Sequence, residues 1–312
     1  MNHRTVLLTL ASSIALSFAV VVGAQGPPPV VPGELLGSTG AIGADLISID
    51  PTTGAGTSRF PLGSLGPVSE IRFGPDGVLY GTTGGGTANL ITIDPDTGAE
   101  TLVGNYGGGA VTALEFANGV LYGAHFNTGP PPSLGAPTDL VEVDLTDGSL
   151  TTIGTISGFS PVRGLAYDAT TGTMFGIGIS QVANGGDPEG GGSDELFTID
   201  LGTGTPTPVG STGGFEVGGM TFGPGGLLYG GSAISSTADL GGGAPLLILD
   251  TSTGAATVVG DTGSPAISGL AFVPGAGGGG GGILAIPTAS HMGLLLLGAL
   301  LAAAALFVLR RG

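Results

Sequence analysis

Short apolar runs separated by turn-forming residues dominate the sequence between residues 33 and 274. The segment from Val68 to Gly104 holds four such runs, SEIRF, VLYG, NLITID and ETLVG, divided by glycine, aspartate, threonine and proline. Runs of this length that are rich in valine, isoleucine and tyrosine are typical of β-strands, and the residues between them are typical of tight turns. The pattern predicts an all-β domain.

The same four-run unit recurs along the chain. Full copies begin at Val68, Val111, Val162 and Val217. A unit of about 40–50 residues with four strands is typical of one blade of a β-propeller. The aspartate that ends the third run marks the period, with spacings of 44, 50, 56 and 50 residues between Asp50, Asp94, Asp144, Asp200 and Asp250.

The two incomplete copies at the ends of the array complement each other. The first copy begins at Leu35 and lacks the opening strand, whereas the last copy supplies only that strand, from Ile267 to Val273. Propellers avoid exposed sheet edges by pairing strands from the two chain ends in one blade. We therefore expect five four-stranded blades, with the ring closed by the N- and C-terminal strands.

Two recurring features fit this blade. In Asp50–Gly54 and Asp94–Gly98, the aspartate side chain is placed to accept hydrogen bonds from turn amides, and glycine accepts a positive φ. One blade position is aromatic in four copies, which we interpret as packing between blades. These residues are Tyr80, Tyr122, Phe175 and Tyr229.

The array resembles the secreted propeller repeats of the YVTN and NHL-like kind. Gly74-Pro75-Asp76-Gly77 followed by Leu79-Tyr80 matches their "PDG-x-LY" turn, and Asp50 and Asp94 begin turns of their "IDP-x-TG" kind. The resemblance implies a scaffold, because such repeats share no single activity.

The first 24 residues match a secretory signal peptide. His3 and Arg4 precede an apolar run that ends near Val22, and small residues lead to a predicted cleavage site between Ala24 and Gln25. A proline-rich extended segment follows at residues 25–32. The sequence thus predicts export by Sec-type machinery, and the alternative is an uncleaved anchor helix.

The last part of the chain has the layout of a sorting signal. A glycine-rich tether at residues 275–285 leads into a short motif, an apolar stretch that ends at Leu309, and the pair Arg310-Arg311. Residues 286–312 resemble the PEP-CTERM type of C-terminal signal, in its IPTL variant. Ala289 and Met292 depart from that motif, and the residues that match it are Ile286, Pro287, Thr288, Ser290 and Gly293.

The resemblance implies a partner and a location. An exosortase-like transpeptidase would process the tail, which would lie in the membrane as a hydrophobic helix before processing. We expect the protein at the cell envelope, on the outer surface, or outside a Gram-negative-type bacterium. A simple tail anchor is the alternative reading.

Charge and cysteine usage narrow the functional classes. All 23 acidic residues lie between Glu34 and Asp261, where only three arginines and no lysine accompany them, so this part has a net charge of −20. Nucleic acid is therefore not an expected partner, because phosphate binding needs clustered cations. The absence of cysteine excludes thiolate catalysis and cysteine-ligated metal sites.

Two features suggest ligand chemistry. The acidic, glycine-rich insertion at residues 185–195 is a candidate calcium loop, because calcium prefers several oxygen ligands on flexible backbone, and a solvated acidic loop is the alternative. No other cofactor is expected. His125, which ends a strand before a long loop, is expected near one mouth of the ring. The candidate calcium ligands are Asp187, Glu189, Asp194 and Glu195.

The sequence contains no catalytic signature. We therefore expect a surface or matrix propeller that is not an enzyme and that has a binding, adhesion or structural role, with an envelope or matrix polysaccharide or protein as its partner. The alternative is a secreted carbohydrate-active hydrolase or lyase that uses aspartate and glutamate residues in the central pore.

Overall fold

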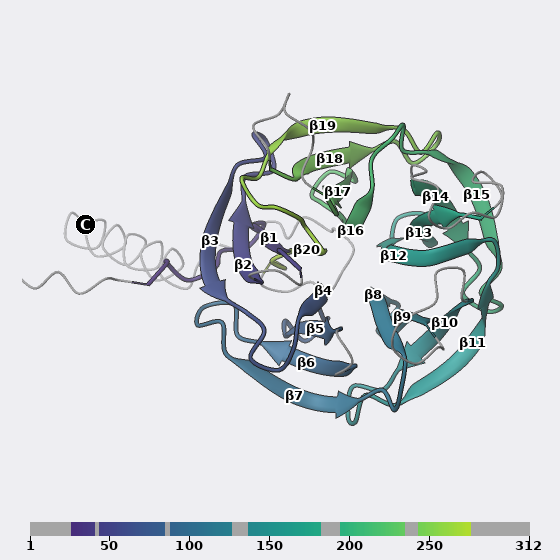
Figure 1. Cartoon of the computed structure of the whole chain (residues 1–312), viewed down its shortest axis with the longest axis horizontal. Coiled ribbons are helices and arrows are strands. Elements are labelled where there is room, and N and C mark those ends of the chain that lie inside the picture. The colour runs from purple at the N-terminus through teal and green to yellow at the C-terminus, as the bar shows by residue number, and fades with distance from the viewer. Residues whose placement is uncertain are drawn as a thin grey trace, which may run out of the picture.

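The computed structural model describes residues 26–40, 44–84, 88–126, 137–181, 194–234 and 243–275. In these ranges the chain forms five antiparallel sheets of four strands each, arranged as blades around a central axis (Figure 1). This confirms the predicted five-bladed propeller. The signal and C-terminal helices expected from the sequence lie outside the described residues, and no helix within the described ranges is long and apolar enough to span a membrane.

The closing blade combines both ends of the array. Its order is β20-β1-β2-β3, and β1 pairs antiparallel with β20 from Leu35 opposite Phe272 to Ser38 opposite Gly269. This confirms the predicted closure by the chain ends. The strands of this blade are β1 (Leu35–Ser38), β2 (Asp45–Ile49), β3 (Gly56–Pro61) and β20 (Gly269–Phe272).

The other four blades are each built from consecutive strands. The second blade holds β4 (Val68–Phe73), β5 (Leu79–Thr83), β6 (Asn89–Ile93) and β7 (Glu100–Asn105). The third holds β8 (Ala110–Ala117), β9 (Val120–Phe126), β10 (Thr138–Val143) and β11 (Leu150–Ile156). The fourth holds β12 (Phe159–Asp168), β13 (Thr173–Ser180), β14 (Asp194–Ile199) and β15 (Pro206–Ser211). The fifth holds β16 (Val217–Phe222), β17 (Leu228–Ser232), β18 (Pro245–Leu249) and β19 (Ala256–Asp261).

The apolar core lies between neighbouring blades. The recurring aromatic residues are buried there, and the rings of three of them pack against an aromatic residue of the next blade: Tyr80 on Phe116 at 5.7 Å, Phe175 on Phe222 at 5.8 Å and Tyr229 on Phe272 at 5.4 Å between ring centroids. Such pairs add to the free energy of area burial. The prediction that this position mediates packing between blades is confirmed.

The predicted turn chemistry is also present. The carboxylate of Asp50 accepts the Thr52 amide at 2.8 Å, and that of Asp94 accepts the Asp96 amide at 2.9 Å. Hydrogen bonds to the ionised form lower the pKa of both carboxyls below their usual value. The acidic residues of these turns are thus accounted for by the scaffold.

Glycine on the outer strands allows neighbouring blades to approach closely. A Cβ on Gly154 of β11 would collide with the backbone carbonyl of Thr203 in the turn between β14 and β15. Gly104, Gly210 and Gly260 repeat this arrangement against the corresponding turn of the next blade. Part of the high glycine content therefore reflects contact between blades.

Gly154→Ala is expected to destabilise the protein by about 1 to 3 kcal/mol, because the added methyl group overpacks this contact. Gly202→Ala is the matched control, since Gly202 has an ordinary φ and its nearest neighbour is the Asp200 Oδ1 atom at 3.4 Å. Urea unfolding of both variants gives the comparison. Equal stability of the two would contradict this account of the glycines.

Candidate functional site

One end of the ring carries the irregular part of each blade. The innermost strands β4, β8, β12, β16 and β20 line the axis and all begin at this end (Figure 1). The registers of β4, β8, β12 and β16 shift near their first residues, which leaves one extra residue at the same place in each strand, and β12 has a further shift just before it. Such bulges redirect a side chain, and here they occur where the axis opens. The extra residues are Ser69, Thr112, Arg163 and Gly218, and Ser268 precedes β20 at the corresponding place.

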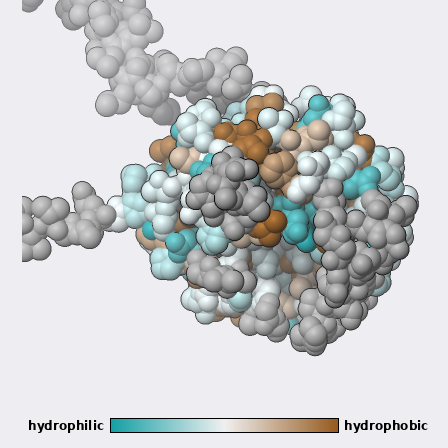
Figure 2. Space-filling view, turned by 45° about the horizontal axis from the view of Figure 1, so that its top comes forward, coloured by the Kyte–Doolittle hydropathy of each residue, from teal (hydrophilic) through white to brown (hydrophobic). Residues whose placement is uncertain are grey.

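A small pocket occupies this mouth of the ring. Its volume is about 230 Å³, and bulge residues from the third, fourth and fifth blades contribute to its wall. Figure 2 shows a hydrophobic and a hydrophilic patch side by side near the centre of the visible face. The lining residues are Gly40, Thr112, Arg163, Gly218, Ala233, Ala266, Ile267 and Ser268.

Arg163 of the pocket wall contacts two carboxylates, Asp194 and Glu216, that are not themselves part of the lining, and we call these three residues the mouth cluster. Arg163 Nη1 lies 2.7 Å from Glu216 Oε2 and 3.6 Å from Asp194 Oδ2. Both oxygens lie near the same nitrogen, so the Arg163 guanidinium joins the two carboxylates.

The repeat shows that these three residues are departures from the scaffold. The positions equivalent to Arg163 hold only serine, threonine or glycine in the other blades. Asp194 stands two residues before a recurring leucine, and Glu216 stands before the apolar residue that starts the inner strand. The equivalents of Asp194 are Ala44, Ala88, Thr138 and Ala244, and those of Glu216 are Pro67, Ala110, Pro161 and Ala266.

Asp194 is the most unusual member of the mouth cluster. Its side chain is fully buried; the Oδ2 atom accepts the Val217 amide at 2.6 Å, and the Oδ1 atom has no hydrogen-bond partner. Burial raises the pKa of Asp194 to about 6, although the nearby Arg163 guanidinium acts in the opposite direction. A carboxyl with a pKa near neutrality can both give and take a proton under ordinary conditions.

A second charged group lies deeper on the axis, and we call Glu70, Arg72 and Glu115 the axial cluster. Arg72 donates from Nε to the Leu114 carbonyl at 3.1 Å, and its Nη2 atom donates to carbonyls on β12 and β16 at 3.1 and 2.6 Å. It thereby joins its own blade to three others. Its Nη1 atom lies 3.5 Å from Glu115 Oε2.

Glu70 is enclosed below the mouth. Its Oε1 atom accepts the Ile71 and Leu270 amides at 3.0 and 3.3 Å, and its Oε2 atom has no partner. Burial raises the pKa of Glu70 well above its usual value, and it also raises that of Glu115. The axial cluster and Asp194 are buried, so Arg163 and Glu216 are the members of the two clusters that a ligand can reach.

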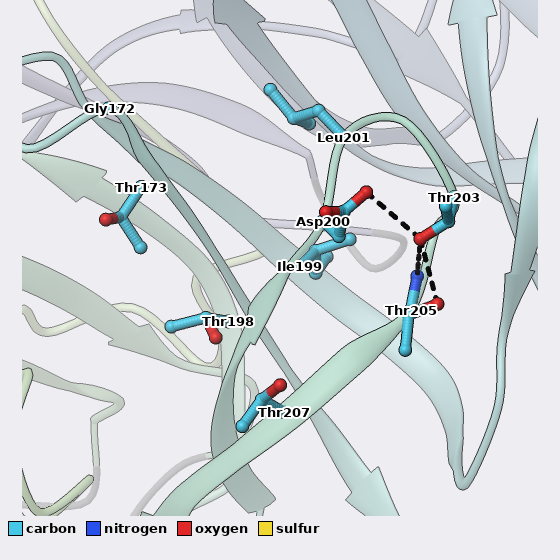
Figure 3. A pocket seen from close by; sticks show the side chains of 9 residues that line it. All are labelled: Gly172, Thr173, Thr198, Ile199, Asp200, Leu201, Thr203, Thr205 and Thr207. Carbon is cyan, nitrogen blue, oxygen red and sulfur yellow. Dashed lines mark hydrogen bonds between the residues drawn. The ribbon is translucent and has the colours of Figure 1, made fainter.

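A larger depression lies elsewhere, on the fourth blade, with a volume of about 650 Å³. Figure 3 shows that its wall is mostly threonine, with Asp200 beside the turn. The Thr203 hydroxyl donates to Asp200 Oδ1 at 3.0 Å and lies 2.8 Å from the Thr205 hydroxyl. These bonds stay within one turn, and the same aspartate–threonine pairing recurs at Asp250 and Thr253. The depression therefore belongs to the scaffold.

The structure separates the candidate calcium ligands that it describes. The sequence suggested that Asp194 and Glu195 lie in a loop, but both belong to the start of strand β14. Adjacent residues of a strand face opposite sides of the sheet, so these two side chains point apart. Asp194 faces Arg163, while Asp187 and Glu189 lie outside the described residues. Among the described residues, no group of three or more acidic or histidine side chains could hold a metal ion.

His125 lies on β9, at the end of the ring that carries the mouth. Its Nε2 atom is 3.0 Å from the Gly108 carbonyl, and across the sheet it pairs with Asp139. The predicted cleavage site and sorting motif lie outside the described residues. Arg163 and Glu216 were not among the sequence candidates, although comparing equivalent positions of the repeat would have revealed them.

Comparison with known proteins shows likeness at the level of the fold. No protein-family model and no curated protein matches the sequence. Among solved structures, one titled as a nidogen/laminin complex is 10% identical, with a TM-score of 0.47, and the match covers 77% of this chain and 98% of that one.

Two further similar structures carry the names of enzymes. A gluconolactonase from Xanthomonas campestris is 15% identical with a TM-score of 0.45, and the match covers 75% of this chain and 78% of that one. The PQQ-bound aldose sugar dehydrogenase from Streptomyces coelicolor is 14% identical with a TM-score of 0.44, covering 69% and 87%.

These structures correct the prediction that the protein is not an enzyme. That prediction rested on the missing motifs and on the scarcity of reactive side chains. Propellers titled as a gluconolactonase and as a sugar dehydrogenase are among the structures similar to this chain, and the prediction is withdrawn.

Arg72→Met is expected to lower the free energy of unfolding by about 3–5 kcal/mol, because it leaves Glu115 buried without a counter-charge. Adding Glu115→Gln should restore part of this loss, and a double-mutant cycle in urea measures the coupling. Additive effects of the two substitutions would contradict the proposed pairing.

The stability contribution of Asp194 should depend on pH. The folded-state pKa of about 6 exceeds the ordinary value of 3.8, so the contribution is complete below about pH 4 and declines as the pH rises to about 6. Relative to Asp194→Asn, the wild type should lose about 3 kcal/mol over this range. Urea unfolding at several pH values tests this, and a difference that does not vary with pH would refute it.

Proposed function

We propose that the protein is an exported propeller enzyme that performs acid–base chemistry on a small, sugar-derived substrate in the mouth pocket. The observation that carries the proposal is the mouth cluster itself. Three charged residues replace uncharged ones at three separate positions of the repeat, and the fold brings all three together. Residues that serve only the scaffold recur from blade to blade. Residues that do not recur but meet in space therefore favour the hypothesis of a functional site.

The two carboxyls have different surroundings, which suits them to different roles. Asp194 is fully buried with a raised pKa, whereas the Glu216 side chain is 31% exposed and pairs with Arg163. Carboxyl pairs with contrasting environments commonly divide the roles of acid and base. We assign the proton-donating role to Asp194 and the proton-accepting role to Glu216, in hydrolysis or elimination.

The pocket has room for a small substrate and offers it one charged group. Its volume of about 230 Å³ is close to that of a single sugar ring, and Arg163 is the charged residue of its wall. The hydroxyls of Thr112 and Ser268 in the same wall donate to the backbone carbonyls of Val162 and Val68. A protein with the leader and sorting tail predicted from the sequence would meet sugar-derived molecules in the cell envelope or outside the cell. The two terminal segments support export, which is part of the proposal.

The purified protein should be assayed against sugar lactones, chromogenic glycosides and uronate-containing oligosaccharides. With the substrate that is turned over, Asp194→Asn and Glu216→Gln are each expected to lower kcat/KM by about 10²–10⁴-fold, the usual contribution of a positioned acid or base. Glu195→Gln is the matched control, because Glu195 neighbours Asp194 on the opposite side of β14.

Wild-type activity in either mouth variant, or an equal loss in Glu195→Gln, would refute the assignment. Thermal unfolding of each variant at the assay pH separates a loss of chemistry from a loss of fold.

A further inference from the structure

Arg163 uses only part of its hydrogen-bonding capacity. Both of its ion pairs are made by Nη1, and within the described residues no contact engages Nε or Nη2. The side chain is 21% exposed and lines the mouth pocket. Since a guanidinium carries five N–H donors, most of them remain available to a ligand.

The available donors have a definite shape. Nε and Nη2 form one edge of the planar guanidinium group, and their two N–H bonds run parallel. This edge matches the two oxygens of a carboxylate, which it binds through a pair of charge-assisted hydrogen bonds. The contacts through Nη1 fix the other side of the group, so the edge is held in place before a ligand arrives.

The other two arginines between Glu34 and Asp261 are occupied in the scaffold. Arg72 is bound on the axis, and Arg59 donates to Glu34 at 3.0 Å and to the Pro28 carbonyl at 2.6 Å. Their side chains are 6% and 4% exposed. Arg163 is therefore the arginine of the described residues that a solute can reach.

The surroundings of Arg163 leave room for a ligand. Its neighbours in the pocket wall include Gly218, Ala233 and Ala266, whose side chains are absent or small. Gly218, at the bulge position of the fifth blade, lets the backbone of Ile267 approach closely, because a Cβ there would collide with the Ile267 carbonyl. The polar edge of Arg163 thus adjoins open volume.

We propose that the Nε–Nη2 edge of Arg163 binds a carboxylate of the substrate, so that the mouth pocket selects sugar acids, such as uronates, over neutral sugars. This rests on the proposed function for the identity of the pocket, and it adds the chemical class of the substrate. Arg163 then determines specificity, while Asp194 and Glu216 provide the acid and base.

Binding of three matched probes to the wild-type protein tests the proposal without requiring turnover. The probes are D-glucuronate, its neutral amide and D-glucose, titrated by calorimetry, with inorganic phosphate as a further arm. Glucuronate should bind at least tenfold more tightly than either neutral probe and than phosphate, as expected for a paired charge-assisted contact.

Variants locate the effect. Arg163→Lys should lose most of the preference, because an ammonium group cannot present two parallel donors. The double variant Arg163→Met/Asp194→Asn should lose it entirely while avoiding an unpaired buried carboxylate. Arg59→Lys, which alters an ion pair on the far side of the closing blade, should leave the preference unchanged.

Equal binding of glucuronate and its amide, retention of the preference in both Arg163 variants, or phosphate binding as tight as that of glucuronate would each overturn the proposal. These outcomes are distinct from failure of the proposed function, which shows in the turnover of Asp194→Asn and Glu216→Gln. A protein that prefers glucuronate through Arg163 but does not need Asp194 for turnover would support the carboxylate contact alone.

Discussion

The pairing of β20 with β1 is the constraint on which the rest of the structure depends. This contact joins residues more than 230 positions apart in the sequence and turns a row of blades into a ring. Only in a closed ring do the five inner strands face one axis. The reach of Arg72 to carbonyls on three other blades requires that geometry.

The axial cluster and the mouth cluster contain the same types of charged residue but differ in their exposure to solvent. In each cluster an arginine meets two carboxyl groups, within a body that is otherwise strongly acidic. At the axis, Arg72 is buried, and it donates to backbone carbonyls and pairs with Glu115. At the mouth, Arg163 is partly exposed and keeps an edge of its guanidinium available. The difference in exposure separates a group that holds the ring together from one suited to a ligand.

The scaffold could be predicted from the sequence because the same pattern of strands and turns is repeated in every blade. Strand order, the five blades, the shared closing blade and the aspartate turns all follow from residues that recur. The site could not be found in the same way, since it consists of residues that do not recur. The acidic neighbours of Asp194 in the sequence suggest a loop. In the structure it takes a strand position that is alanine in the closing, second and fifth blades and threonine in the third. The bulges that aim Arg163 into the mouth leave no mark in a pattern of apolar runs.

Closure by the chain ends also sets the order in which the molecule can be completed. The strand that finishes the first blade is the last strand of the array, so the ring stays open until Phe272 is available. A chain that emerges from its N-terminus first therefore carries β1 with an unpaired edge for almost the whole length of the domain. Such an edge is a template for pairing with other chains. The late arrival of one four-residue strand thus determines how long the folding protein is exposed to misassembly.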